Sequence, residues 1–521
     1  MLTFDDVLEE VGGFGLYQKI TFFFVCLPSA VFSYLYVGFV FLAVTPDHWC
    51  RSPGVTELRD KCNWSLEQEK NYTLPVGQSG SSSYSQCEKY DVDWNSSSGS
   101  CENPLLFIWN GSQDLPLITC QDGWVFENDS ISSIVTEFEL VCADSWKLDL
   151  SQACLNLGFT LGTVIMGYAA DRFGRKLSFL FATFVTSVLG LVVPFLPNYS
   201  WFLIFRTLQG LFSKGSWVCA YVFITELVGL QYRRTVGVLY QVCYSSGMMI
   251  LSSVAYFIPD WRNLQLATTI PSFFFLTYYW LIPESPRWML SQKKNTEALS
   301  VIQQMAKRNG KSFSNKIEIV EERSEDLDRP SFVELVRTPQ MRKHTFILMF
   351  NWFAITLVYQ GLIMRLGTLG GNIYLDFFIS GAVEIPAAIL ILLTIERIGR
   401  RLPFAAGGLL SGGTCLIAAF IPEMCSSLCD IGGIAAPFIV YRLSGIWKGL
   451  PLLVLGVIGL IVGGLVLLLP ETKGLTLPDS IEDVENLKRP KKKILKTHHQ
   501  QSVLYSTDVK DPASVKMVVE G

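Results

Sequence analysis

Long apolar runs alternate with polar links along most of this 521-residue chain. A helix that crosses the hydrocarbon core of a bilayer needs about 20 largely apolar residues, because only a helix satisfies its own backbone hydrogen bonds in lipid. The pattern predicts an all-α polytopic membrane protein with about 11 spanning helices, six before a polar central stretch and five after it. The runs are Thr21–Ala43, Ser151–Ala170, Leu177–Pro197, Thr207–Thr225, Thr235–Pro259, Asn263–Pro283, Thr345–Met364, Phe377–Ile395, Leu402–Pro422, Met424–Tyr441 and Gly449–Leu469.

Basic residues gather in alternate links, and this bias sets the orientation of membrane helices. The links after the second, fourth and eighth runs are basic, and the central stretch 284–343 holds twelve Lys and Arg residues. The link 44–150 holds 6 basic and 17 acidic residues instead. With a cytosolic N-terminus the basic links all face the cytosol, so we expect residues 44–150 to lie outside the cell. The acidic residues before the first run indicate that this run is no cleavable signal peptide.

The link 44–150 carries independent signs of an extracellular location. Six cysteines in a polar segment indicate three disulfides, with fifteen pairings open. Five glycosylation sequons in one loop exceed what chance provides. The cysteines are Cys50, Cys62, Cys87, Cys101, Cys120 and Cys142, and the sequons begin at Asn63, Asn71, Asn95, Asn110 and Asn128. The other seven cysteines of the chain are expected to be packing residues.

The two halves repeat one motif. Gly167-x-x-x-Asp171-Arg172-Phe173-Gly174-Arg175-Lys176 follows the second run, and Glu396-Arg397-Ile398-Gly399-Arg400-Arg401 follows the eighth. Each half then closes on a related tag, Pro283-Glu284-Ser285-Pro286-Arg287 and Pro470-Glu471-Thr472-Lys473-Gly474. Acid-Arg-x-Gly-Arg makes a tight charged turn, because Gly permits the bend and Arg stays outside the membrane. Two copies at matching places favour a repeated transporter bundle.

The second half is shorter than the first. From Asp171 to Pro283 the chain runs 112 residues with four apolar runs, and from Glu396 to Pro470 it runs 74 residues with three. The shortfall of 38 residues equals about one helix with its loop, and it falls near Pro422-Glu423. Eleven crossings would place the tail outside, although the basic group Lys488, Arg489, Lys491, Lys492, Lys493 and Lys496 favours the cytosol. Either the last two helices are inverted or one run does not cross.

Composition narrows the function classes. Half of the residues are hydrophobic and 17% are charged, compared with about 25% in soluble domains, which argues against a soluble, disordered or fibrous protein. The net charge of −4 gives no reason to expect a nucleic-acid partner. The four histidines do not cluster, and no nucleotide-binding Gly-Lys-Ser/Thr motif is present. We therefore expect no enzymatic activity, no cofactor and no metal site.

At its motifs the chain resembles the major facilitator superfamily and, more narrowly, the organic cation transporters of solute carrier family 22. The likeness covers nearly the whole chain. It rests on Thr45-Pro46-Asp47-His48, Ser133–Phe138, Gly167–Lys176, Arg206-Thr207-Leu208-Gln209-Gly210, Pro283–Trp288 and Cys425–Gly433. The resemblance implies a twelve-helix bundle of two pseudo-repeated halves, so the missing segment corresponds to the tenth helix, which lines the central cavity in this fold. It also implies polyspecific transport of monoamines, quaternary ammonium compounds and choline-like cations.

Three ionisable residues lie inside apolar runs, where a charge is costly and indicates function. Asp430 is the candidate counter-charge for a cationic substrate, and the alternative is an ion pair within the bundle, for instance with Lys214. In the organic anion branch of the family that this chain resembles, the position of Asp430 is basic instead. The resemblance therefore implies that an acid here favours cations over anions. Glu384 either senses substrate charge or satisfies backbone groups freed by Pro386. Lys214 fits a structural or gating ion pair better than substrate contact, because an ammonium would repel a cation.

Aromatic residues are candidates for cation binding, because a ring face attracts an alkylated cation by about 0.5–2 kcal/mol. The pairs Phe32/Tyr36 and Trp217/Tyr221 are four residues apart, so each pair shares a helix face. Packing against lipid or other helices is the alternative for every ring, and the resemblance favours Tyr36, Trp217 and Trp352. The full candidate set is Phe32, Tyr36, Phe159, Trp217, Tyr221, Tyr244, Trp352 and Tyr359, with Gln241 and Gln360 as hydrogen-bonding groups.

The charged turns are candidates for a cytosolic latch, whose ion pairs form in one conformation and break in the other. Arg206 and Glu226 flank the fourth run and are expected in the same network. Anchoring of the topology is the alternative role. The remaining members are Asp171, Arg172, Arg175, Lys176, Glu396, Arg397 and Arg400.

We therefore expect facilitated, electrogenic uptake of small organic cations by alternating access at the plasma membrane, basolateral in epithelia if the chain follows the family. The alternatives are sodium-coupled transport of zwitterions such as carnitine, and a non-transporting truncated isoform. Expected partners are organic cations, the lipid bilayer and a second copy bound through the extracellular loop. The expected division is 1–20 cytosolic, 21–43 first helix, 44–150 extracellular, 151–283 rest of the N-terminal half, 284–344 cytosolic loop, 345–470 C-terminal half and 471–521 basic tail.

Overall fold

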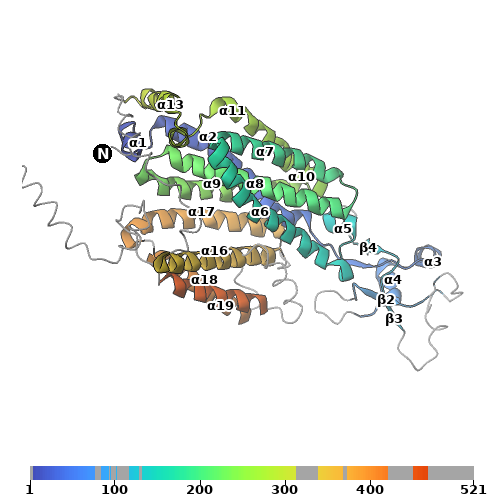
Figure 1. The fold of residues 1–521 in the computed structure, drawn as a ribbon. Helices are drawn as coiled ribbons and strands as arrows, with labels where there is room; N and C mark the ends of the chain where they lie inside the picture. The colour runs from blue at the N-terminus through green and yellow to red at the C-terminus, as the bar shows by residue number, and fades with distance from the viewer. Residues whose placement is uncertain are drawn as a thin grey trace, which may run out of the picture.

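The computed structural model describes residues 4–76, 84–92, 94, 101, 116–127, 132–311, 338–367, 372–399, 401–420 and 450–467. Long helices lie side by side in one bundle, with a small disulfide-linked domain at one end and α1 and α13 at the other (Figure 1). We call these the domain end and the basic end. The long helices are α2 Leu16–Leu42, α6 Trp146–Phe173, α7 Arg175–Val192, α8 Tyr199–Leu227, α9 Leu230–Phe257, α16 Pro339–Leu366, α17 Ile373–Ile398, α18 Arg401–Phe420 and α19 Leu450–Val466.

These helices confirm the expected class of fold. Within the described residues, six helical stretches are long and apolar enough to cross a membrane, and α8 runs for 29 residues within the same bundle. The run Asn263–Pro283 is not the continuous helix we expected. It divides into α10 (Trp261–Thr269), the 3₁₀ helix η3 (Ile270–Thr277) and α11 (Tyr278–Leu281). Pro271 stands at the start of η3, where it removes a backbone donor and breaks the α-helical ladder. The run Met424–Tyr441 lies outside the described residues.

Within the N-terminal half, small residues bring helices into close contact. A Cβ atom at Gly162 of α6 would lie 2.0 Å from the carbonyl oxygen of Leu211 in α8, so only glycine fits there. A Cβ atom at Gly247 of α9 would likewise lie 2.4 Å from the carbonyl oxygen of Ala30 in α2. Close backbone contact through glycine is a common way for membrane helices to associate. It fixes α2, α6, α8 and α9 around one interior.

The two halves meet near the domain end of the bundle. Phe41 of α2 packs against Phe377 and Tyr374 of α17, with ring centroids 5.1 and 5.7 Å apart. Ile363 and Leu366 of α16 are buried in the same apolar cluster, which also includes the outer turns of α9. The bundle is therefore sealed by apolar side chains at the end that carries the disulfide domain.

The disulfide domain contains two small antiparallel sheets and short helices. Strand β1 (His48–Cys50) pairs with β4 (Trp124–Phe126), and β2 (Glu88–Tyr90) pairs with β3 (Leu117–Thr119). Helices α3 (Val55–Cys62), α4 (Leu66–Thr73) and α5 (Ile134–Phe138) complete it, and the 3₁₀ helices η1 (Cys142–Asp144) and η2 (Val193–Phe195) flank α6 and α7.

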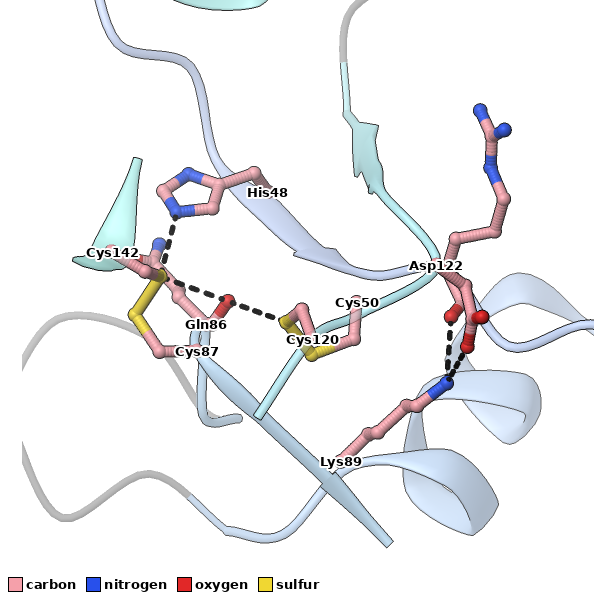
Figure 2. The surroundings of a disulfide bond; sticks show 9 residues. His48, Cys50, Gln86, Cys87, Lys89, Cys120, Asp122 and Cys142 are labelled. Carbon is pink, nitrogen blue, oxygen red and sulfur yellow. Dashed lines mark hydrogen bonds and ion pairs between the residues drawn. A yellow bond between two sulfur atoms is a disulfide. The ribbon is translucent and has the colours of Figure 1, made fainter. Parts of the chain in front are cut away.

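The three disulfides select one of the fifteen pairings. They join Cys50 to Cys120, Cys62 to Cys101 and Cys87 to Cys142. Figure 2 shows the first and third on either side of Gln86, with the His48 ring beside Cys142. The Cys87–Cys142 bond ties the domain to the root of α6. Of the glycosylation candidates, Asn63 and Asn71 are exposed, whereas Asn95, Asn110 and Asn128 lie outside the described residues.

The basic end is more ordered than the expected loops suggest. Helix α1 (Phe4–Glu10), α12 (Pro286–Ser291) and α13 (Asn295–Arg308) fold against the N-terminal half. The Asn309 side chain accepts a hydrogen bond from the Tyr17 backbone N–H at 3.0 Å and donates to the Val11 carbonyl at 3.0 Å. These hydrogen bonds therefore hold the start of the central stretch, after α13, against the N-terminal segment before α2.

Candidate functional site

Six aromatic rings from five helices form a continuous cluster inside the bundle, which we call the aromatic cage. Phe32 is its centre, with ring centroids 5.8 Å from Tyr36, 5.7 Å from Phe159 and 5.6 Å from Trp217. The remaining members are Tyr244 of α9 and Tyr359 of α16. The structure thus brings together residues that lie up to 327 positions apart in the sequence.

The cage joins the two halves of the chain. The Tyr359 hydroxyl donates to the Tyr244 hydroxyl at 2.8 Å, which links α16 of the second half to α9 of the first. Tyr36 lies 5.6 Å from the Tyr359 ring. A group bound between these rings would therefore contact both halves of the bundle at once.

Lys214 lies in the cage rather than in a separate gate. Its ammonium nitrogen is 4.3 Å from the centre of the Trp217 indole and 5.2 Å from the centre of the Phe32 ring. Within the described part of the chain, no carboxylate lies at ion-pair distance from it. The attraction between a cation and the negative face of a ring accounts for this position.

Glu384 lies at the contact between the halves. Its carboxylate accepts a hydrogen bond from the Ser245 hydroxyl of α9, which also donates to the Gln241 carbonyl at 3.2 Å. Gln241 itself is exposed. Ser245 follows Tyr244 on α9, so the Glu384 carboxylate contacts the same turn of α9 that carries a cage ring.

Other candidates are placed differently. Tyr221 stacks on Trp217 at 6.1 Å, at the edge of the cage, and Gln360 is buried at 1% exposure. Trp352 of α16 is 70% exposed and makes no ring contact with the cage among the described residues, so its expected place in the cavity stays a prediction. Seven residues make about two helical turns, so Trp352 lies on the same face of α16 as Tyr359 but about 10 Å away along the axis. Asp430 lies outside the described residues.

The first charged turn forms a compact ion-pair network at the basic end. Arg175 pairs with Asp171 at 2.8 Å and with Glu226 at 2.9 Å, and its guanidinium donates to both Glu226 oxygens. Glu284 accepts hydrogen bonds from the backbone N–H groups of Arg175 and Lys176 at 3.0 and 3.1 Å. The network therefore ties α6, α7 and α8 to the tag that ends the first half.

Arg206 does not belong to this network, contrary to our expectation. It lies 20 residues before Glu226 on the same helix, which is about 30 Å along the axis. It is 1% exposed, and its guanidinium lies 5.6 Å from the Phe39 ring and 6.0 Å from the Phe202 ring. Two ends of one spanning helix cannot face the same side of a membrane.

For the other residues that were expected in the cytosolic latch, the structure shows no comparable ion-pair network among the described residues. Arg172 is exposed, and the Lys176 ammonium lies 5.0 Å from the centre of the Tyr279 ring. In the second half Arg397 is exposed, while Arg400 and the side chain of Glu396 lie outside the described residues. A matching network in the second half therefore stays a prediction.

Sequence reasoning missed several residues that the structure places at these sites. Tyr240 is 2% exposed, donates to the Trp217 carbonyl at 3.2 Å and lies 5.6 Å from its ring. Its spacing of four from Tyr244 was the signal that could have found it. Ser285 donates to Glu226 at 2.5 Å, and it belongs to the repeated tag, although no role was assigned to it.

Comparison with known proteins identifies the family. A family model for "Sugar (and other) transporter" matches residues 76–430. Human solute carrier family 22 member 2 is 51% identical and covers 94% of this chain and 96% of its own length. Member 1 from Oryctolagus cuniculus is 50% identical over 94% and 97%, and member 3 from Rattus norvegicus is 46% identical over 94% and 96%.

A solved structure confirms the fold. The partially occluded inward open conformation of the xylose transporter XylE from E. coli matches with a TM-score of 0.53 at 16% identity, covering 88% of this chain and 100% of that one. The alignment with the human relative spans 536 positions but uses 94% of the 521 residues here. The relative thus has several tens of residues without a counterpart in this chain, in agreement with the shortfall of one helix and its loop.

Proposed function

The chain belongs to solute carrier family 22 of the major facilitator superfamily, and from this premise we propose that it carries small organic cations across the plasma membrane. Family and fold are those of multi-pass membrane transporters. The substrate class is argued from the site itself. We propose monoamines, quaternary ammonium compounds and choline-like cations, carried by alternating access and driven by the membrane potential.

The observation that carries this proposal is the position of Lys214. Its ammonium lies against the faces of Phe32 and Trp217, at 5.2 and 4.3 Å from their centres. The cage therefore already accommodates one cation, supplied by the protein. An N-alkylated substrate ammonium has the same charge and a softer, more polarisable surface, so it suits the same ring faces.

The charges around the cage favour cations over anions. Glu384 supplies a carboxylate at the α9–α17 contact, hydrogen-bonded to Ser245. Asp430 is the acidic residue inside the apolar run Met424–Tyr441, as Glu384 is inside Phe377–Ile395. We propose that Asp430 supplies the principal counter-charge for the substrate. In this account the substrate and Lys214 compete for acidic groups and ring faces. The incoming cation displaces the lysine, which then serves as a placeholder in the empty site.

Two features support alternating access. Apolar side chains of α2, α9, α16 and α17 seal the domain end, and the Arg175 network braces the basic end of the first half. A rocking motion of one half against the other would open the apolar seal, while the Arg175 network moves with the first half. We propose that this network keeps the basic end of the first half rigid during the motion.

Uptake of radiolabelled tetraethylammonium tests the proposal in cells expressing the chain, with surface protein quantified in the same cells. We expect uptake that exceeds that of control cells, falls on depolarisation with external potassium and persists when sodium is replaced. Loss of uptake on sodium replacement, together with carnitine uptake, would show the zwitterion alternative instead. Surface protein at a normal level without any uptake would make this chain a non-transporting isoform.

The isoform alternative rests on a specific observation, the 38-residue shortfall in the second half. A bundle that lacks one cavity-lining helix loses part of its wall. If such a chain reaches the surface, we expect it to associate with a full-length relative. Homo-oligomerisation through residues 44–150 stays a prediction, which crosslinking of the intact protein would test.

A further inference from the structure

Two thiols face each other across the seam between α2 and α9. Cys26 is 2% exposed, and Cys243 is half-buried against the same apolar cluster. Both thiols pack in one apolar cluster between these helices, and neither belongs to a disulfide. No part of the transport mechanism described above uses them.

The contact between the two helices explains why these thiols meet. The Ser29 hydroxyl of α2 donates to the Tyr240 carbonyl of α9 at 3.3 Å, one turn away from the thiols on each helix. Gly247 then brings the α9 backbone against Ala30, where any Cβ atom would collide with a carbonyl oxygen at 2.4 Å. Positions 26, 29 and 30 on α2 and 240, 243 and 247 on α9 share one interface, because residues three or four apart lie on one face.

We propose that Cys26 and Cys243 form a dithiol site that binds trivalent arsenicals. Soft thiolate ligands prefer soft, thiophilic centres. An arsenical with an As=O group forms two As–S bonds while both thiol protons leave on its oxygen as water. Arsenic stays trivalent, so no oxidant is required. The half-buried Cys243 reacts first, and the buried Cys26 then closes the ring in an intramolecular step with a high effective concentration.

The other thiols of the described chain do not offer such a pair. Cys219 donates to the Met166 carbonyl at 3.8 Å, and Cys154 lies on α6. The cysteines of the disulfide domain are oxidised and cannot bind. A chelate across α2 and α9 is therefore specific to Cys26 and Cys243 within the part of the chain that the structure describes.

Occupation of this site should act on the aromatic cage. Both thiols pack in the apolar cluster that contains Tyr240, whose hydroxyl donates to the Trp217 carbonyl at 3.2 Å. Tyr240 is 2% exposed, so an arsenic atom with its substituent has no free space beside it. Overpacking of such an interior shifts neighbouring side chains. The displaced Tyr240 would move Trp217 out of the position it holds in the cage.

The test of binding uses the intact chain and phenylarsine oxide, a neutral membrane-permeant trivalent arsenical. After treatment and washing with excess 2-mercaptoethanol, peptide mass spectrometry should find arsenic bridging the Cys26 and Cys243 peptides. 2,3-Dimercaptopropanol should release it. Retention should fall at least tenfold in Cys26→Ser and in Cys243→Ser, and it should be unchanged in the matched control Cys154→Ser. Arsenic that maps only to other cysteines, or retention in both serine variants equal to that of the unmodified chain, would overturn the proposal.

A second readout depends on the proposed transport function. Phenylarsine oxide should lower tetraethylammonium uptake at least fivefold in the unmodified chain and leave Cys243→Ser unaffected, at equal surface protein. Full occupancy of the site with unchanged uptake would overturn the link to the cage. If the chain carries no tetraethylammonium at all, the peptide map still decides the binding proposal, so the two failures are distinguishable.

Discussion

Trp217 and Lys214 together define the chemistry of the cage. The indole face lies 4.3 Å from the lysine ammonium, and the lysine has no carboxylate partner in the described residues. Each such ring contact is worth only about 0.5–2 kcal/mol, so these contacts let the cation leave when another cation arrives. This suits a transporter, which must release what it binds.

Trp217→Ala should weaken cation binding more than any change at an outward ring. Loss of one ring face costs about 0.5–2 kcal/mol, which is about 2- to 30-fold in the apparent KM for tetraethylammonium. Trp217→Phe should lose less. Trp352→Ala is the matched control, because that side chain is 70% exposed and outside the cage. Equal KM values for Trp217→Ala and the unmodified chain would contradict the cage.

Glu384→Gln removes the carboxylate that is hydrogen-bonded to Ser245 and keeps the shape of the side chain. We expect the apparent KM for cations to rise about tenfold, because one nearby opposite charge is typically worth one to three pKa units of interaction. Ser245→Ala keeps the charge and removes only the hydrogen bond, so it should change KM less. The idea fails if the two variants have the same kinetics.

At the residue scale the sequence predicted which rings share a helix face, because residues four apart on one helix lie on one side of it. Phe32 and Tyr36 illustrate this. It could not predict which face turns inward, since that depends on the neighbours of each helix. On α16 the spacing was not sufficient either, because Trp352 shares a face with Tyr359 but lies about 10 Å away along the axis.

At the scale of elements, the Arg175 network shows how a turn motif becomes a brace. Arg175 and Glu226 have side chains that are only 12% exposed, and their contact is bidentate. Such geometry gives a planar guanidinium two parallel hydrogen bonds to one carboxylate. The brace therefore joins three helices through a single side chain.

Glu226→Gln should destabilise the first half. Removal of one partner from a buried pair costs about 3 kcal/mol, because the remaining charge stays buried. We expect a lower Tm for the detergent-solubilised protein and less protein at the surface. Arg172→Ala is the control, since that residue is exposed. An unchanged Tm in Glu226→Gln would mean that the pair does not brace the fold.

His48 makes the disulfide domain sensitive to acid. Burial lowers the pKa of this ring below its ordinary value of 6.5, although the Pro46 carbonyl and Asp47 act in the opposite direction. The neutral ring therefore stabilises the domain fully above about pH 6.5, and this contribution falls as the pH drops towards the lowered pKa.

We predict that limited proteolysis of residues 44–150 in the intact protein is faster at pH 5.5 than at pH 7.5, by at most about tenfold for one pH unit of titration. His48→Gln cannot gain a proton and should lose most of this difference. The same ratio of rates in both proteins would show that another group is responsible.

The elements also show where sequence patterns stop being informative. Spanning helices are predictable because lipid demands a minimum apolar length. The break at Pro271 and the folding of α12 and α13 against α1 depend on tertiary contacts such as those of Asn309, which no local pattern contains. The disulfide pairing likewise depends on strand pairing between β1 and β4, far apart in sequence.

For the whole molecule, the repeated motif predicted both the bundle of two halves and the segment that is missing from the second half. The same charged turn in each half predicted a two-part bundle, which the fold and the relatives confirm. Comparison of the halves located a loss of 38 residues, because true repeats should have equal lengths. Alternating access around a cation site depends on the whole bundle of eleven predicted helices, and no single residue determines it.

The most direct test is the steady-state accumulation of tetraethylammonium in proteoliposomes that contain the purified chain, under potassium diffusion potentials set with valinomycin. A membrane potential contributes about 2.3 kcal/mol per charge per 100 mV. The account predicts an accumulation ratio that rises with the imposed potential, towards about 50-fold at 100 mV, without a sodium gradient. A ratio that stays at one at every potential would contradict it.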